Sequence, residues 1–148
     1  MIFVTVGTTK FDSLIKTVDE IARHIDEPII CQIADGTYVP KNCQYFRFKP
    51  TLDDEFGSAD LVVCHGGAGT LFKLLELNKM IISVPNLERK DKHQTDLINT
   101  LAHENYIISC NELPELHAMI LNSKTVCLTK YAKPECKIAE EIIRFIEG

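Results

Sequence analysis

The sequence contains no run of about 18 apolar residues, the length that a membrane-spanning helix needs. Its apolar opening, residues 1–6, has no basic stretch before it, and residues 7–10 interrupt it before it reaches the length of a secretory leader. We therefore expect neither a membrane span nor export, and we predict a cytoplasmic location.

Residue spacings typical of metal sites are also missing. The six cysteines form no C-x-x-C pair and lie far apart in the sequence, and no His and Cys cluster has zinc spacing. No D-x-D pair is available to hold a divalent cation. We predict no metal and no cofactor, and we interpret the cysteines as free thiols that act as small buried hydrophobes in a reducing compartment.

A serine nucleophile elbow and an obvious pair of catalytic carboxylates are missing too, so the sequence assigns no catalytic residue.

The net charge argues against a nucleic-acid-binding protein. Sixteen Lys and Arg residues face 21 Asp and Glu residues, a net charge of −5, whereas proteins that neutralise nucleic-acid phosphates usually carry the opposite sign. We therefore expect no nucleic-acid partner.

What the chain does contain is the composition of one globular domain. It has 148 residues, of which 45% are hydrophobic and 25% charged, and it shows no internal repeat, low-complexity segment or linker. We predict a single domain over residues 1–148.

Short apolar runs alternate with amphipathic segments along most of this domain. We predict strands at residues 2–6, 28–34, 43–48, 61–64, 80–84 and 106–109, and helices at 11–24, 52–57, 68–77, 92–103 and 113–121. Such alternation is typical of parallel strands joined by right-handed crossovers. The predicted fold class is α/β, with a Rossmann-like parallel sheet flanked by helices.

A last amphipathic helix is predicted at residues 134–147, after an irregular stretch at 122–133. Pro134 suits its first turn, and Ile138, Ile142 and Ile146 recur at helical spacing. This apolar stripe covers either the protein's own sheet or the surface of another chain.

Three groups of residues follow predicted strands, where ligands bind in an open parallel sheet. Gly7, Thr8 and Thr9 follow the first strand, and a second group runs from His65 through Gly66, Gly67, Ala68 and Gly69 to Thr70. Asn86 follows a third strand, and His93 and Gln94 begin the next helix.

The glycine-rich turn at residues 66–69 carries the sharpest signal. Its glycines open a predicted helix, where unpaired N–H groups and the positive end of the helix dipole favour a phosphate. A Walker A loop is excluded because no Lys follows the last glycine, and the dinucleotide fingerprint fails because a third glycine is missing at the required place. Binding of a diphosphate and simple tight packing both remain open.

The polar residues near this turn have similar alternatives. His65 is either a satisfied structural histidine or a donor to a phosphate or sugar oxygen. His93 and Gln94 either form a solvated first turn or hold sugar hydroxyls, because a side-chain amide both donates and accepts hydrogen bonds.

The ordered set of these motifs resembles one known family. The set comprises residues 3–9 with Phe11-Asp12, Gln32-Ile33, Gly36-Thr37, Val39-Pro40, residues 59–62, residues 65–70, Val84-Pro85-Asn86 and His93-Gln94. It is similar to the glycosyltransferase family 28 C-terminal domain, and within that family to the stand-alone subunits of UDP-N-acetylglucosamine transferases of dolichol-linked oligosaccharide synthesis. The resemblance runs from Ile2 to about Cys110.

The resemblance implies the donor-binding half of an inverting GT-B glycosyltransferase that is split over two chains. It implies UDP-GlcNAc as donor, a lipid-diphosphate-linked sugar as acceptor, and a membrane-anchored acceptor-binding subunit that recruits this chain to the cytosolic face of the endoplasmic reticulum. The C-terminal helix would take part in that docking. Bacterial exopolysaccharide transferase subunits that use UDP-glucose or UDP-galactose look similar, and a non-catalytic nucleotide-sugar-binding subunit is a further alternative.

One residue departs from the family pattern. Four residues after Gly69 the family often has a Glu that holds the ribose hydroxyls, whereas this chain has Lys73. Glu76 lies three residues further on, on the same helix face, and is the predicted substitute.

Overall fold

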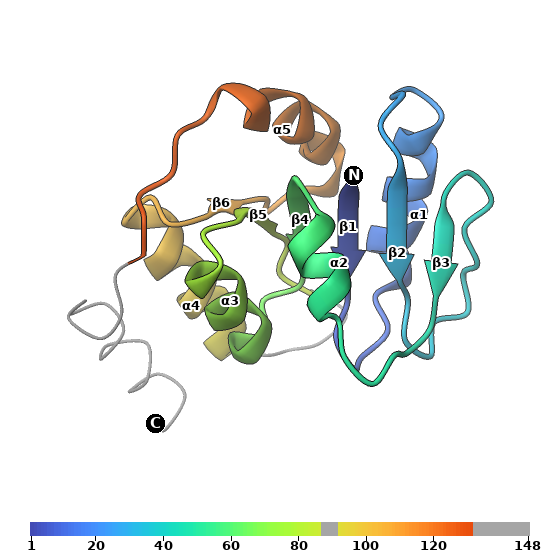
Figure 1. The fold of residues 1–148 in the computed structure, drawn as a ribbon, viewed down its shortest axis with the longest axis horizontal. Coiled ribbons are helices and arrows are strands. Elements are labelled where there is room, and N and C mark those ends of the chain that lie inside the picture. Colours follow the sequence, from blue (N-terminus) through green and yellow to red (C-terminus); the bar gives the residue numbers. More distant parts are fainter. Residues whose placement is uncertain (87–91, 132–148) are drawn as a thin grey trace.

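The computed structural model describes residues 1–86 and 92–131 (Figure 1). Its strands are β1 Ile2–Thr5, β2 Ile29–Gln32, β3 Gln44–Phe46, β4 Leu61–Cys64, β5 Met80–Ser83 and β6 Ile108–Ser109. Its helices are α1 Asp12–Ala22, α2 Asp53–Ser58, α3 Ala68–Glu76, α4 Lys92–His103 and α5 Leu116–Asn122, with 3₁₀ turns at Leu113–Glu115 and Ser123–Thr125.

These strands form one parallel sheet in the order β3-β2-β1-β4-β5-β6. Helices cover both of its faces, as Figure 1 shows. One face packs against α1 and α5 through residues such as Leu14 and Leu116, and the other packs against α2, α3 and α4 through Phe56, Leu74 and Ile98. The predicted α/β fold class is confirmed.

The two central strands are buried along their whole length. Every residue of β1 and β4 is buried, because helices lie on both sides of them. In α1, Leu14, Ile15 and Val18 recur at helical spacing and face the core, which explains why this segment folds as a helix against the sheet.

The predicted element ends differ from the observed ones for identifiable reasons. β1 ends at Thr5 because the next backbone N–H, that of Val6, donates to the side chain of Gln32 (3.1 Å). β2 ends at Gln32, and Ala34 beyond it has φ 53°, which no regular strand accommodates. The predicted helix at 113–121 begins with a 3₁₀ turn containing Pro114, and its α-helical part is Leu116–Asn122.

Two carboxylates of α1 hold the connection between β2 and β3. Asp12 accepts hydrogen bonds from the hydroxyl and N–H of Thr37 (2.7 and 3.3 Å) and from the N–H of Tyr38. Asp19, only 2% exposed, accepts the Tyr38 hydroxyl (2.6 Å) and the N–H groups of Lys41 and Asn42. A long connection is thereby fixed to a helix by side chains.

Burial raises the pKa of Asp19, but the hydrogen bonds from Tyr38, Asn42 and Lys41 outweigh this and hold the pKa below its ordinary value. A carboxylate with a depressed pKa stabilises the folded state above its unfolded pKa of about 3.9. That contribution is lost as the pH falls through the folded pKa.

We expect Asp19→Asn to lower the free energy of unfolding by about 2 kcal/mol at pH 7, because a buried charged acceptor of several hydrogen bonds is lost. The measurement is urea denaturation, with the exposed Asp26→Asn as control, for which a change under about 0.5 kcal/mol is expected. The difference between wild type and Asp19→Asn should shrink below about pH 4. An equal loss in both variants would contradict this role.

Candidate functional site

Three loops meet at the carboxyl ends of the neighbouring strands β1, β4 and β5. Thr5 aligns with Cys64, and Cys64 with Ser83, so the segments that follow leave the same edge of the sheet. The N–H of His65 donates to the Thr5 carbonyl (3.3 Å), and the side-chain amide of Asn86 donates to the Lys10 carbonyl (3.3 Å).

The structure thus brings together most of the predicted site residues: Gly7, Thr8, Thr9, His65, Gly66, Gly67, Ala68, Gly69, Thr70 and Asn86. Thr8 and Gly69 are exposed, whereas Asn86 is buried.

These loops also lie where consecutive connections pass to opposite faces of the sheet. α1, which follows β1, packs on one face, and α3, which follows β4, packs on the other. In open parallel sheets the crevice between two such strands is the usual ligand site, because their loops diverge there.

The amino-terminal turn of α3 is open to an anionic ligand. Gly67 occupies the N-cap position in an extended conformation, no side chain caps the helix, and its first turn holds no acidic residue. Among the described residues, the N–H groups at the start of this helix therefore have neither an intrahelical partner nor a side-chain cap, and the helix dipole adds positive potential. This arrangement suits a phosphate oxygen.

The imidazole of His65 explains two of the glycines. A Cβ atom on Gly7 would lie 2.6 Å from the His65 ring, and a Cβ on Gly67 would also collide with that ring. Gly7 further has φ 71°, a left-handed conformation that favours glycine. By contrast, a Cβ on Gly69 would meet nothing within 4 Å in residues 1–86 and 92–131, so packing within this part of the chain does not require that glycine.

Gln32 holds the Gly7 loop, a role that no sequence pattern predicted. Its side-chain carbonyl accepts the Thr5 hydroxyl (2.7 Å) and the N–H groups of Val6 and Gly7 (3.1 Å each). Its amide donates to the carbonyls of Gly7 (2.9 Å) and Arg47 (2.8 Å). The available signal was a polar residue inside an apolar strand, since a buried amide must find hydrogen-bond partners.

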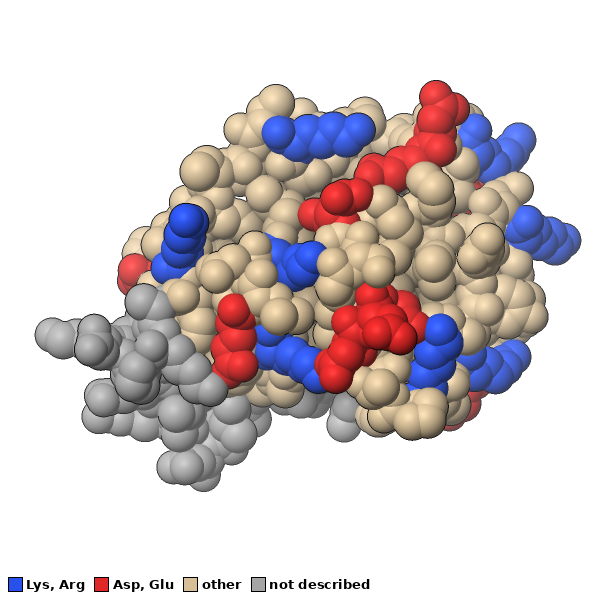
Figure 2. Space-filling model, in the orientation of Figure 1, with Lys and Arg blue, Asp and Glu red and all other residues tan. Residues whose placement is uncertain are grey.

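Lys73 is engaged by α2 rather than by the glycine turn. Its ammonium group pairs with the Asp53 carboxylate, and a hydrogen bond from Lys73 lowers the pKa of Asp53. Asp53 and Asp54 belong to the acidic first turn of α2, and acidic side chains gather over this helix in Figure 2. Glu76 is the last residue of α3, about 10 Å along the helix axis from Gly69 at 1.5 Å per residue, so the structure does not bring it to the glycine turn.

The structure describes only the backbone of two predicted site residues and does not describe one predicted helix. His93 and Gln94 lie in the first turn of α4, as predicted, but their side chains are outside the described part. The predicted helix at 134–147 lies wholly outside the described residues.

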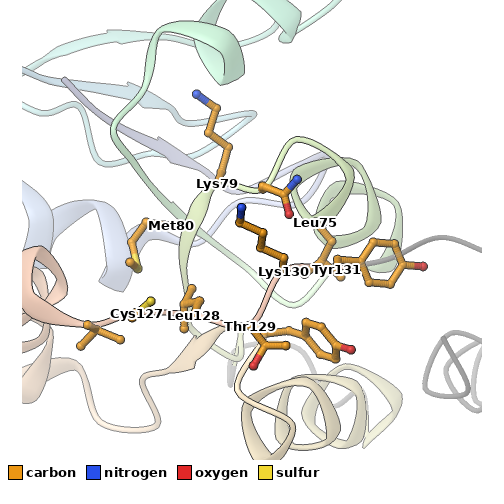
Figure 3. Close-up of a pocket in the computed structure, with 11 residues that line it drawn as sticks. Leu75, Lys79, Met80, Cys127, Leu128, Thr129, Lys130 and Tyr131 are labelled. Carbon is orange, nitrogen blue, oxygen red and sulfur yellow. The ribbon is translucent and has the colours of Figure 1, made fainter.

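A separate cavity of about 260 Å³ lies at the opposite edge of the sheet (Figure 3). Its lining includes Asn78, Lys79 and Met80, just before and at the start of β5, and the chain segment from Val126 to Tyr131. Lys79 donates to the carbonyls of Gly57 and Ala59. The cavity therefore belongs to the amino ends of the strands and is distinct from the loop cluster.

Within residues 1–86 and 92–131, no three His, Cys, Asp or Glu side chains are grouped so that they could hold a metal ion. No helix in the same ranges has the length and apolar character needed to cross a bilayer.

We expect Gly67→Ala to lower the free energy of unfolding by about 2 kcal/mol, because the new methyl group must displace the His65 ring. In a His65→Ala background the same change should cost less than about 0.5 kcal/mol, a coupling that a double-mutant cycle in urea measures.

Gly7→Ala is the matched comparison. In the His65→Ala background it should still cost about 1 kcal/mol, since its positive φ remains. Additive costs for Gly67→Ala and His65→Ala would show that the ring does not require this glycine.

Comparison with known proteins defines the class. The glycosyltransferase family 28 C-terminal domain matches residues 1–146, and the chain belongs to this family. Among curated proteins, it is similar to the human UDP-N-acetylglucosamine transferase subunit ALG13, with 34% identity over 122 residues, and to the mouse protein of that name, with 32% identity over 121 residues. The matches cover 74% and 73% of this chain but only 11% and 10% of those two relatives.

Solved structures show the same fold. An NMR structure of ALG13 aligns with a TM-score of 0.63 at 19% identity and covers 96% of this chain and 93% of its own. MurG from Acinetobacter baumannii aligns with a TM-score of 0.66 at 19% identity over 84% of this chain and 42% of its own. The predicted likeness to one half of a GT-B glycosyltransferase is confirmed at the level of fold.

Proposed function

We propose that this chain is the donor-binding subunit of a UDP-N-acetylglucosamine transferase. The observation that carries the proposal is the uncapped first turn of α3, which opens beside the Gly7 loop where α1 and α3 leave for opposite faces of the sheet. Family membership and the printed names of the human and mouse relatives support the choice of donor.

In this proposal the diphosphate of the donor rests on residues 66–70. The N–H groups of the α3 first turn donate to its oxygens, and His65 donates to a phosphate or sugar oxygen. Gly7, Thr8 and Thr9 close the site near the sugar and phosphate, next to Asn86. His93 and Gln94 hold the sugar hydroxyls.

The chemistry then depends on the leaving group. When the bond between the sugar and UDP breaks, negative charge grows on the diphosphate, and fixed N–H dipoles stabilise that charge without reorganisation. No metal is needed in this scheme. Transfer proceeds with inversion, because the acceptor hydroxyl attacks from the face opposite UDP.

The acceptor and partner complete the proposal. The chain would add the second GlcNAc to GlcNAc-diphospho-dolichol with a membrane-anchored subunit that binds this acceptor at the cytosolic face of the endoplasmic reticulum. The general base is not assigned to this chain, because in a split enzyme it can belong to the partner. The C-terminal helix is the predicted docking element.

We expect Gly69→Ala to weaken UDP-GlcNAc binding at least about tenfold while leaving stability unchanged or slightly higher. The new methyl group meets nothing within 4 Å among the described residues. In the proposed complex it would compete for space with a diphosphate bound to the α3 amides. The measurement is a titration followed by amide chemical shifts.

Gly57→Ala in α2 is the matched control, because its added methyl group also meets nothing within 4 Å. It should bind UDP-GlcNAc like the wild type. If the wild type, Gly69→Ala and Gly57→Ala bind UDP-GlcNAc with equal affinity, the diphosphate does not bind at the α3 turn.

We expect the isolated chain to transfer labelled GlcNAc from UDP-GlcNAc at a rate close to background, and the complex with the membrane-anchored partner to be active. The reason is that the acceptor site lies on the other chain. Full turnover by the isolated chain would refute the split enzyme.

Two alternatives have distinct outcomes. A subunit of the bacterial exopolysaccharide type would prefer UDP-glucose or UDP-galactose in the same titration. The ion pair between Lys73 and Asp53 favours a non-catalytic nucleotide-sugar-binding subunit, since the position usually used for a ribose contact is occupied by a cation held by α2. Donor binding without transfer by the complex would support that alternative.

A further inference from the structure

Two of the cysteines that are widely spaced in the sequence meet in the fold. The Sγ atoms of Cys31, in β2, and Cys43, directly before β3, lie 3.5 Å apart. Both are free thiols, as are Cys64, Cys110 and Cys127. Cys136 lies outside the described residues.

The register of the sheet explains this contact. Ile30 pairs with Gln44 in the parallel ladder, so Cys43 comes beside Ile29, and Ile29 and Cys31 point to the same face of β2. Both cysteines pack into the core cluster under α1. A disulfide would bring the sulfurs to about 2.05 Å, so the chain at Cys43, which precedes the first residue of β3, would have to shift toward β2.

The two thiols differ in access. Cys31 is fully buried, whereas Cys43 is half-buried and has the exposed residues Asn42 and Gln44 on either side. A small reagent can therefore reach Cys43 and not Cys31. The pair has the arrangement of an attacking thiol and a buried resolving thiol.

Electrostatics favour the same division of roles. A hydrogen bond from the Cys31 thiol lowers the pKa of Cys43, while that hydrogen bond and burial raise the pKa of Cys31. Asp19 acts against this lowering, because its carboxylate accepts a hydrogen bond from the Cys43 thiol (3.8 Å) and disfavours the thiolate.

We propose that Cys31 and Cys43 form a reversible intramolecular disulfide by exchange with a low-molecular-weight disulfide of the glutathione type. The Cys43 thiolate attacks one sulfur of oxidised glutathione, forms a mixed disulfide and releases one glutathione thiolate. Cys31 then attacks the Cys43 sulfur, its proton passes to the second departing glutathione, and the protein dithiol is oxidised while glutathione disulfide is reduced to two thiols.

The bond would fasten the connection of residues 32–42 at its two ends. This is the segment that Asp12 and Asp19 already hold by hydrogen bonds. The inference is independent of the proposed donor binding, because neither sulfur belongs to the loop cluster at β1, β4 and β5.

The test is to equilibrate the reduced full chain with oxidised glutathione, quench in acid, alkylate and measure intact mass. We expect the six alkylated thiols of the reduced chain to fall to four, with a loss of about 2 Da before alkylation and no glutathione adduct. Peptide mapping should identify a disulfide between Cys31 and Cys43, and dithiothreitol should restore six free thiols. In the oxidised form, hydrogen exchange of the Lys41 and Asn42 backbone amides should be slower than in the reduced form.

Variants separate the two roles. Cys31→Ala should keep a stable glutathione adduct on Cys43, because the resolving thiol is missing. Cys43→Ser should form neither a glutathione adduct at position 43 nor a disulfide with Cys31. Cys127→Ser, which changes an exposed thiol outside the pair, should behave as wild type. If Cys31→Ala fails to fold, the wild-type peptide map still decides. A persistent adduct on wild-type Cys43, a disulfide between other cysteines, or six unchanged thiols would each overturn the proposal.

Discussion

The ring of His65 lies between two chain segments that both lack a Cβ atom where they face it. Gly7 follows the end of β1, Gly67 occupies the N-cap position of α3, and neither could carry a side chain with the ring in place. Packing therefore fixes how the β1 loop and the α3 turn approach each other. Gln32 completes this constraint, because its amide binds the Gly7 backbone on both its N–H and its carbonyl side.

This constraint gives the glycine-rich turn two different kinds of glycine. Gly67 is explained by a contact within the chain, so its presence is no evidence for a ligand. Gly69 is exposed, and a Cβ atom there would meet nothing within 4 Å among the residues that the structure describes. It also lies in a first turn to which those residues supply no side-chain cap. The case for an anionic ligand thus depends on Gly69 and the helix dipole rather than on glycine content.

A second part of the molecule is organised around α1 and the β2–β3 connection. Asp12 and Asp19 supply carboxylate oxygens to backbone N–H groups that no strand satisfies, and burial of Asp19 makes each of these hydrogen bonds matter for stability. Cys31 and Cys43 lie under the same helix. Cys31 and Gln32 are adjacent in sequence, yet the two thiols lie on the α1 face of the sheet, whereas Gln32 holds the Gly7 loop at the carboxyl end of β1.

Local pattern was enough to predict the strands and helices of the described residues and the three groups of residues at strand ends, because apolar periodicity and glycine positions are properties of neighbouring residues. It predicted that Gly7, His65 and Asn86 share one edge, since parallel strands direct their carboxyl ends the same way. Only the tertiary structure decided which side chains meet across strands. The His65 contact with Gly7, the five hydrogen bonds of Gln32, the pairing of Lys73 with Asp53 and the approach of Cys31 to Cys43 all depend on strand order and register. Those are set by packing of the whole chain, and residues distant in sequence carry no local sign of them.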